Sequence, residues 1–596
     1  MNTRTNDPRA CESAPPGPAA QALHPASGNG LANLAVVRSP GARTLFLVSA
    51  AITATILLWA NHLLLAGYLA GLHPIFYILF THFDYPAAMW MLFALLAAAL
   101  LSGRVSARPV ALWVSEHCGI IAAATAAVFA VGTLVVYRDH PLALDEYTVL
   151  FQSKVFASGH LATRFPPQLL NWLIPQEFQD YFLNVSPATG QVASAYWPSF
   201  SLLLTPFTFL GIPWACNPVI SALSIIAIHR LTLTAFEDRE AAGLAVLLTL
   251  ASPVFFADGI SFYSMSAHML ANTLFAILLS KASPRRALAA GAVGSVALTL
   301  HNPVPHLLFA LPWLVWLARR PGSGKAFGAL ILGYLPLCLL LGFGWFFFSI
   351  HLLHAGTRPQ STTLHVGTLR HMLSAFTLPS FEVLDIRLVD LAKIWLWSVP
   401  GLLVIAGIGA WKWRDRTVCR LLAASAVLTI LGYAFVPFDQ GHGWGDRYFQ
   451  SAWMVLPILA AGALTRRRAA PSAGFLEAAD TRAFVVACAL AFLVAGVGLR
   501  AAQIHAFISD DLRQLPAYRG RGRRVEFIDV RHSFYGADLV QNDPRLRGKV
   551  IRLVDYGPKL DAAIMRKYFP SFREVYADPH GTVWVARTAA AAAPVR

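Results

Sequence analysis

The chain has 596 residues, of which 56% are hydrophobic and only 13% are Asp, Glu, Lys or Arg. Soluble proteins carry about a quarter charged residues, so this chain has too few polar side chains to cover soluble cores. Its 12% aromatic residues exclude disorder for most of its length. The net charge is +16, but the aromatic residues lie in apolar stretches rather than on one basic soluble surface, which excludes a nucleic-acid-binding protein.

The N-terminal residues 1–43 are rich in Pro, Ala, Gly, Asn and Ser without periodicity, which predicts a disordered cytoplasmic tail. The first apolar stretch begins only at residue 44 and is far longer than the apolar core of a signal peptide, so we expect no cleavable signal. The chain is therefore expected to be an all-α polytopic membrane protein whose membrane domain covers residues 44–510.

Long uncharged stretches, such as 44–83 and 326–357, each hold one or two spans, because a bilayer core of about 30 Å takes about 20 helical residues. With Gly, Pro and charge clusters as boundaries, we expect about 13 transmembrane helices, near residues 44–66, 86–103, 118–137, 216–229, 241–257, 265–280, 287–301, 305–318, 326–350, 393–411, 420–436, 449–465 and 483–500. These spans are expected to carry essentially no ionisable residues. Residues 198–212 are apolar but bracketed by prolines, which favours an interfacial helix.

The basic residues of the short loops gather on one side of the expected spans. Eighteen Lys and Arg fall on that side and seven on the other, whose loops are together about twice as long. This positive-inside pattern predicts a multi-pass protein of the cell inner (plasma) membrane, with a cytoplasmic N-terminus and a periplasmic or external C-terminal domain. Membrane lipids with anionic headgroups are expected partners of the basic loops.

Three external loops are expected, at residues 138–197, 351–392 and 437–448. The second has apolar residues at helical spacing among scattered charges, which predicts an amphipathic helix on the outer membrane surface. Residues 511–596 contain two strand-like segments, a helix-like segment and a hairpin pattern, which predict a small C-terminal external α/β domain. The six cysteines lie outside these external segments and form no CxxC, which argues against a disulfide framework or a thiolate metal site.

The sharpest chemical signal is Asp145-Glu146-Tyr147, which opens a helix on the external side soon after the third expected span. The helix dipole favours carboxylates in a first turn, so an ordinary structural role is a real alternative. The position of the pair at the external membrane surface, at the head of an amphipathic helix, favours a catalytic role.

The first external loop resembles that of integral-membrane glycosyltransferases of the GT-C class, of the protein-mannosyltransferase and aminoarabinose-transferase type. In that class an Asp-Glu pair follows an early span and is followed by an aromatic residue and a small-residue turn. The corresponding residues here are Asp145-Glu146, Tyr147 and Ser158-Gly159.

Two further segments carry this resemblance. Tyr196-Trp197-Pro198 precedes an apolar stretch that ends at Gly211, and is similar to an aromatic-Pro motif of the class. The loop from Gly443 to Tyr448 is similar to an external motif with Gly and Arg. The chain departs from the class where a single Pro198 stands for a double proline and Ala195-Tyr196 stands for a basic residue.

The resemblance implies transfer of a sugar from a polyprenyl-phosphate carrier to an envelope lipid, glycan or protein at the external membrane face. The acceptor hydroxyl is a weak nucleophile, so a carboxylate must accept its proton, a role we assign to Asp145, with Glu146 holding Asp145 or a cation. The leaving lipid phosphate needs a cation, and the guanidinium of Arg447 is the best candidate because it can grip phosphate bidentately. Weaker candidates are Lys154, Arg138 and His301. A single displacement of this kind inverts the anomeric centre.

Further candidates for contact with the substrates are Tyr147, Tyr196, Trp197, Trp444, Tyr448 and Asp258. Each candidate has a structural alternative: aromatic residues form interfacial belts, Arg447 could anchor lipid headgroups, and His301 could cap a helix end. No cluster of His and Asp at ligand spacing occurs, so we expect no metal or other cofactor, although a divalent cation could assist the departure of the phosphate.

Three other functions stay open at this point. A transporter or flippase would need ionisable residues inside its spans, which the expected spans lack. A GT-C-like glycan ligase would use a preassembled lipid-linked glycan instead of one sugar. A non-catalytic scaffold would bind envelope partners through its external domain.

Overall fold

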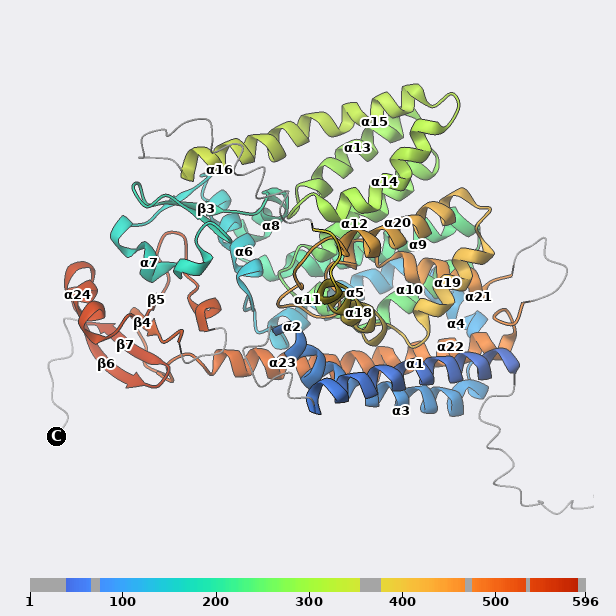
Figure 1. Ribbon diagram of the computed structural model, residues 1–596, viewed down its shortest axis with the longest axis horizontal. Coiled ribbons are helices and arrows are strands. Elements are labelled where there is room, and N and C mark those ends of the chain that lie inside the picture. Colours follow the sequence, from blue (N-terminus) through green and yellow to red (C-terminus); the bar gives the residue numbers. More distant parts are fainter. Residues whose placement is uncertain (1–38, 66–74, 354–376, 467–473, 532–535, 588–596) are drawn as a thin grey trace, which may run out of the picture. The chain divides into compact units, whose positions relative to one another are not determined.

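The computed structural model describes residues 39–65, 75–353, 377–466, 474–531 and 536–587 (Figure 1). Residues Val37–Arg596 form one compact unit. Most of the expected N-terminal tail lies outside the described residues, as do residues 354–376 of the second expected loop. The first helix, α1 (Pro40–Leu65), begins within the last residues of the expected tail.

Helices make up most of the described chain, because a helix satisfies its backbone N–H and C=O groups within one apolar segment. The helices that coincide with expected spans are α1, α3 (Tyr85–Leu101), α5 (Cys118–Val135), α9 (Cys216–Phe236), α10 (Arg239–Leu250), α11 (Pro253–Ile260), α12 (Met265–Ser280), α13 (Pro284–Leu298), α14 (Val304–Arg319), α15 (Gly324–Leu337), α16 (Trp345–Leu353), α19 (Leu402–Lys412), α20 (Thr417–Tyr433), α21 (Val455–Leu464), α22 (Ala479–Ala491) and α23 (Val497–Leu512). Other helices are α2 (Ile75–Ile78), α4 (Ala107–Glu116), α6 (Leu144–Ala157), α7 (Leu170–Leu173), α8 (Ser199–Phe209), α18 (Phe381–Leu396) and α24 (Pro558–Tyr568).

Six helical segments among the described residues are long and apolar enough to cross a membrane: Pro40–Leu65, Ile75–Arg104, Cys118–Val135, Pro213–Phe236, Gly324–Leu353 and Ala479–Leu512. The pair α10 and α11 would add a seventh span, bent by 63° where Pro253, which has no N–H, begins α11. Several shorter apolar helices, including α12 and α14, also coincide with expected spans. The chain is thus a mostly helical, multi-pass membrane protein, and its 13 spans stay a prediction.

The expectation that the spans carry essentially no ionisable residues is wrong. Asp84 lies in the spanning segment Ile75–Arg104, and Arg500 lies in the segment Ala479–Leu512. Their charged groups approach to 2.8 Å, and Lys393 of α18 lies 2.9 Å from the other carboxylate oxygen of Asp84. We call Asp84, Lys393 and Arg500 the buried ion cluster. The cluster cannot be predicted from the sequence, because Lys393 is 309 residues from Asp84. Buried charges are stable only when they are paired, as these are.

Helix α18 lies where the sequence predicted an amphipathic helix in the second loop. Its charged residues Arg387, Asp390 and Lys393 are buried, whereas the apolar side chains of Phe381 and Leu388 are exposed. The helix thus turns charged residues toward the protein and apolar residues outward, and its place on the outer membrane surface stays a prediction.

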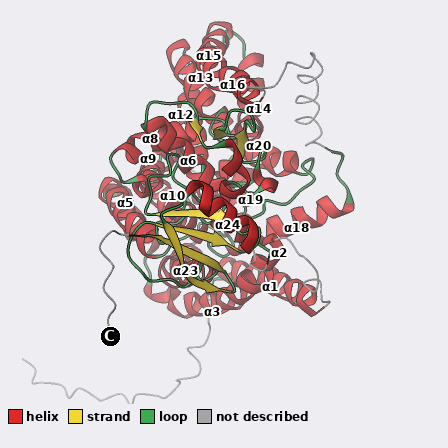
Figure 2. Cartoon of the chain, turned by 90° about the vertical axis from the view of Figure 1, so that its left-hand side faces the viewer, coloured by secondary structure: helices red, strands yellow, loops and turns green. Residues whose placement is uncertain are grey.

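Two small sheets accompany the helices (Figure 2). In the first external loop, β3 (Gln191–Ser194) pairs antiparallel with both β1 (Thr163–Arg164) and β2 (Leu183–Val185). The second, which we call the C-terminal sheet, has the order β5-β4-β7-β6. Here β4 (Arg524–Ile528) runs parallel to β5 (Val550–Val554) and antiparallel to β7 (Gly581–Ala586), which pairs antiparallel with β6 (Phe572–Asp578). These strands and α24 coincide with the segments expected from the sequence.

One apolar core joins the C-terminal sheet to helix α6. It contains Leu144, Phe151 and Val155 from α6 together with Val525, Phe527, Ile551 and Leu553 from the sheet. Burying a large apolar side chain contributes about 1.5–3 kcal/mol, so this shared core holds the two elements together. The C-terminal sheet therefore helps to fix the position of the helix that carries Asp145.

Candidate active site

Asp145 lies in the first turn of α6, and its carboxylate is held by two side chains from other segments. The hydroxyl of Tyr196 donates a hydrogen bond of 2.6 Å to Oδ1, and Nη1 of Arg447 lies 3.5 Å from Oδ2. The side chain of Asp145 is 20% exposed, whereas that of Arg447 is 8% exposed. The structure therefore brings together three residues predicted from the sequence, around a carboxylate that a second molecule can reach.

Arg447 reaches Asp145 because the backbone of the third external loop leaves room for its side chain. Gly443 has φ +133°, and a Cβ atom there would lie 2.4 Å from Cδ of Arg447. The guanidinium lies 4.5 Å from the centre of the Tyr263 ring and donates from Nη2 to the carbonyl of Gln440. Its Nε–H is buried and has no acceptor among the described residues, so it is left for an anion.

The charges around Asp145 keep it ionised. Burial by itself would raise the pKa of this carboxyl, but Arg447, then His301 and Tyr196, lower it below its usual value. His301 lies next to Tyr196, with ring centroids 4.2 Å apart, and burial lowers the pKa of its imidazole to about 4. Near pH 7 the site therefore holds one carboxylate, one guanidinium and one neutral imidazole.

Glu146 is fully buried, and its hydrogen-bond partners differ from those of Asp145. Its carboxylate accepts hydrogen bonds from the backbone N–H of Phe262 (2.7 Å), the backbone N–H of Leu142 (2.9 Å) and the hydroxyl of Tyr137 (3.1 Å). Burial raises the pKa of Glu146 from 4.5 to about 7. The two neighbouring acids thus have different surroundings, and Glu146 ties the start of α6 to the loop after α11.

Asp258 lies in α11 and is 2% exposed. Its carboxylate interacts electrostatically with Arg447, and its Oδ2 has no hydrogen-bond partner among the described residues. Trp197 lies beside the site through its backbone, since its N–H faces the carbonyl of His301 at 3.4 Å, but its ring packs toward Trp345 of α16. The structure therefore places Asp258 near the guanidinium, whereas Trp197 packs against the apolar cluster of Ala193, Trp345 and Leu352.

The other basic candidates have partners elsewhere. Nη1 of Arg138 donates to the hydroxyl of Ser509 at 3.2 Å. Lys154 lies nine residues, about two and a half turns, along α6 from Asp145, and its electrostatic partner is Asp139. Neither cation is brought to Asp145 by the contacts of the described residues.

Two aromatic candidates are also used elsewhere. The hydroxyl of Tyr147 donates to the backbone carbonyl of Asn542 at 2.8 Å, which points it toward the C-terminal sheet. Trp444 is 2% exposed, and its ring lies 6.0 Å from that of Trp397 and 6.3 Å from that of Phe83. Both side chains are thus held by other segments and do not lie at Asp145.

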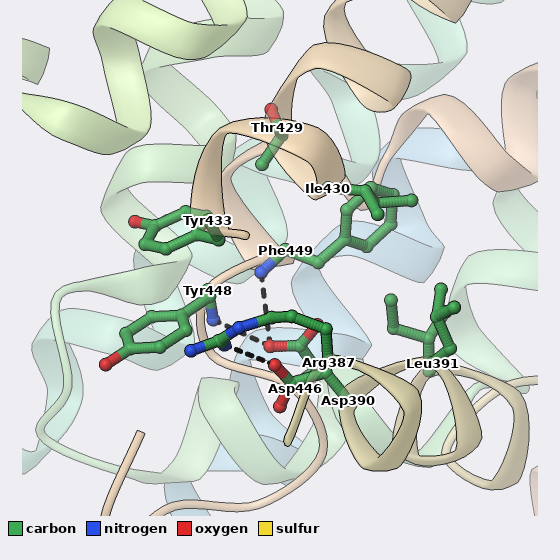
Figure 3. A pocket seen from close by; sticks show the side chains of 10 residues that line it. Arg387, Asp390, Leu391, Thr429, Ile430, Tyr433, Asp446, Tyr448 and Phe449 are labelled. Carbon is green, nitrogen blue, oxygen red and sulfur yellow. Dashed lines mark hydrogen bonds and ion pairs between the residues drawn. The ribbon is translucent and has the colours of Figure 1, made fainter. Parts of the chain in front are cut away.

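Tyr448 lines a small pocket together with Arg387, Asp390, Tyr433 and Asp446 (Figure 3). Its ring stacks on that of Tyr433 at 4.3 Å, and Arg387 forms an ion pair there with Asp390. Asp446 accepts the backbone N–H of Tyr448 at 2.9 Å. These contacts fold the loop that presents Arg447. Among the described residues, no three His, Cys, Asp or Glu side chains gather where they could share a metal ion.

Sequence reasoning missed several residues of the site. Tyr263 supports the guanidinium of Arg447, and Gln440 accepts its backbone N–H at 2.6 Å. His442 acts electrostatically on Asp145, and partial burial and then Asp145 raise the pKa of Tyr181, which is 64% exposed. A signal existed for Tyr263, which stands in the short polar turn between two expected spans on the external side. None existed for Tyr181.

Comparisons with known proteins give distant similarities. No protein-family model matches the chain, and no curated protein matches it. Among solved structures it is similar to ArnT from Cupriavidus metallidurans bound to undecaprenyl phosphate, with 15% identity and a TM-score of 0.49 over 80% of this chain and 99% of that chain. It is also similar to the archaeal oligosaccharyltransferase AglB from Archaeoglobus fulgidus, with 12% identity and a TM-score of 0.37 over 65% and 56% of the two chains. We argue function from this chain's own side chains.

Proposed function

We propose that this protein is a membrane glycosyltransferase that moves a sugar from a polyprenyl-phosphate carrier to a hydroxyl of an envelope lipid, glycan or protein. The observation that carries the proposal is the meeting of Asp145 and Arg447, at 3.5 Å, where the Asp145 side chain is still 20% exposed in a multi-pass membrane protein. A carboxylate for the attacking hydroxyl and a guanidinium for the departing phosphate are the two groups that this reaction needs.

The reaction balances as a single displacement. The acceptor oxygen forms a bond to the anomeric carbon and passes its proton to Asp145. The bond from that carbon to the phosphate oxygen breaks, and the phosphate leaves with the electron pair. Arg447 stabilises the charge that builds on the phosphate, and its unpaired Nε–H supplies a donor that costs no existing hydrogen bond. Attack from the opposite side inverts the anomeric centre.

The pair at the centre of the site couples donor binding to base strength. Arg447 is the largest influence that lowers the pKa of Asp145 against the effect of burial. A bound phosphate that draws the guanidinium toward itself weakens the interaction between Arg447 and Asp145. The pKa of Asp145 then rises, so the carboxylate becomes a stronger base once the donor is bound. The attack is thereby favoured when the leaving group is in place.

The site opens at the external face if the positive-inside pattern of the loops sets the orientation. Asp145, Arg447 and His301 all lie in segments that this pattern assigns to the external side. A polyprenyl carrier would reach the pocket from the bilayer, and the acceptor from the envelope. We propose no cofactor for this step, and a divalent cation that assists the departure of the phosphate stays an open alternative.

A transporter is the second function that one observation favours, because the buried ion cluster places charges inside spanning segments. Asp84 accepts from Lys393, Arg500 and the indole of Trp397, all within 2.9 Å, and the side chain of Asp84 is 1% exposed. A carboxylate with three partners and no access suits a structural tie better than a carrier of ions. The site around Asp145 has the opposite character.

Mass spectrometry of envelope glycans and glycolipids tests the proposal in strains that carry the native protein, no protein, Asp145→Asn or Arg447→Ala at matched levels. Loss of the same single-sugar mass in the deletion and in both variants supports transfer, and the mass identifies the sugar. The control is Asp510→Asn, which changes an exposed acid of α23. If Asp145→Asn restores the glycans that the deletion loses, Asp145 is not the base. Loss of a whole oligosaccharide would indicate a glycan ligase.

A further inference from the structure

The first turn of α6, which carries Asp145, depends on a residue of the C-terminal segment. Its N-cap is Ala143, whose side chain cannot accept a hydrogen bond, so the first backbone N–H groups of the helix need partners from elsewhere. The N–H of Leu144 donates to Oδ1 of Asp538 at 3.0 Å, across 394 residues of sequence. Asp538 thus caps the helix directly before Asp145.

The segment around Asp538 makes further hydrogen bonds to the start of α6. The 3₁₀ helix Gly536–Leu539 is followed by Gln541, which donates to the carbonyl of Pro141 at 2.7 Å. Asn542 exchanges two hydrogen bonds with the hydroxyl of Tyr147, at 2.8 and 2.9 Å. The first residues of α6 are therefore held from the loop before the helix to its first full turn.

The second oxygen of Asp538 reaches the other half of the site. Its Oδ2 lies 3.5 Å from Nε2 of His442, a residue of the loop that presents Arg447. Both side chains are buried, at 7% and 8% exposure. Burial raises the pKa of Asp538 well above its usual value and lowers that of His442 to about 4.

We propose that Asp538 is a positioning residue that joins the helix of Asp145 to the loop of Arg447, so that the C-terminal segment sets the distance between the two groups. This inference rests on the proposed function for its effect on activity. It assigns the C-terminal segment a part in the active site instead of a separate binding role. Asn at this position would keep an acceptor oxygen for the N–H of Leu144.

Hydrogen exchange by mass spectrometry on the purified full chain tests the link without any substrate. In Asp538→Ala, peptides that cover residues 142–150 and 439–449 should exchange at least tenfold faster, while strands β4 and β5 keep wild-type exchange. Asp538→Asn, which keeps an acceptor for Leu144, should restore most of the protection. The matched control is Asp543→Asn, whose Oδ1 accepts only within its own turn, from Arg545 and Arg547.

The second measurement is the single-sugar product per folded molecule in cells that carry the same variants. We expect at least a tenfold loss for Asp538→Ala and recovery of at least half of the product for Asp538→Asn. Unchanged exchange in α6, equal acceleration throughout the C-terminal sheet, or full product in Asp538→Ala would overturn the inference. If instead Asp145→Asn keeps its product, the proposed function fails, while the exchange data still decide whether Asp538 holds the helix.

Discussion

The buried ion cluster and the site around Asp145 each contain an Asp paired with an Arg, but the two pairs have different roles. In the cluster, Asp84 accepts from Arg500 and Trp397, each at 2.8 Å, and from Lys393 at 2.9 Å, and its side chain is 1% exposed. In the site, Arg447 lies 3.5 Å from Asp145, which is 20% exposed. The carboxylate of Asp84 is buried and fully paired, whereas the carboxylate of Asp145 is partly exposed.

This difference separates groups that hold the fold from groups that react. A buried charge whose partners are complete is costly to disturb and offers nothing to a substrate. A carboxylate with access, beside a guanidinium with an unpaired Nε–H, can exchange its partners during a reaction. The comparison predicts that substitutions in the cluster change stability and that substitutions in the site change activity.

The largest expected effect is that of Asp145→Asn. Asn is isosteric but cannot accept the proton, so transfer should fall by about 10²- to 10⁴-fold, the usual contribution of a general base. The melting temperature in detergent should stay near that of the wild type, because Asn still accepts the hydrogen bond of Tyr196. A loss of activity that follows a loss of folded protein would remove the distinction between the two regions.

Asp84→Ala should have the next largest effect, on stability. It leaves two buried cations without their carboxylate, which typically costs about 3–5 kcal/mol. Thermal unfolding in detergent measures the loss. Asp510→Ala is the matched control, since Asp510 pairs with Arg513 on the same helix as Arg500 but is 65% exposed, and exposed pairs contribute about 0–1 kcal/mol. Equal melting temperatures for the two variants would contradict the structural role.

Glu146 should show its structural role in the pH dependence of stability. Its pKa is raised on folding from 4.5 to about 7, so the folded state binds this proton more tightly and loses stability as the pH rises through that range. The loss amounts to about 3 kcal/mol for this group, and Glu146→Gln should remove it from the slope. The exposed Glu177→Gln should leave the slope of melting temperature against pH unchanged. An unaltered slope in Glu146→Gln would contradict this account.

The smallest expected effect is a shift in the pH profile of Tyr196→Phe. The hydroxyl of Tyr196 helps to lower the pKa of Asp145, so its removal raises that pKa. Because the base acts when deprotonated, the acidic limb of the rate profile should move to higher pH. The hydrogen bond that is removed, to a charged group, is worth about 1.5–3 kcal/mol. Tyr448→Phe, whose hydroxyl donates to the Asp439 carbonyl, should leave the limb in place. A shift in both variants would argue against a specific contact.

The sequence predicted the segments that meet at the site better than their partners. The Asp145 helix, the glycine loop with Arg447 and the strands of the C-terminal sheet all follow from local patterns of residues. The contacts that link them do not, because Asp538 caps a helix that begins 394 residues earlier, and nothing near either residue reveals the pairing. The pairing of Asp84 with Lys393 is likewise not visible from the sequence around either residue. The charged residues of α18 look solvent-exposed in the sequence, because the partners that bury them lie on distant segments.

The most direct test of the central claim compares Asp145→Asn and Asp84→Asn in the same experiment. It measures the single-sugar product per folded molecule in cells, with the folded amount taken from size-exclusion chromatography. We predict that Asp145→Asn is present at the wild-type level without product, whereas Asp84→Asn is depleted but keeps wild-type product per folded molecule. Product in Asp145→Asn, or product per folded molecule that falls equally in both, would contradict the assignment of chemistry to Asp145 and of structure to Asp84.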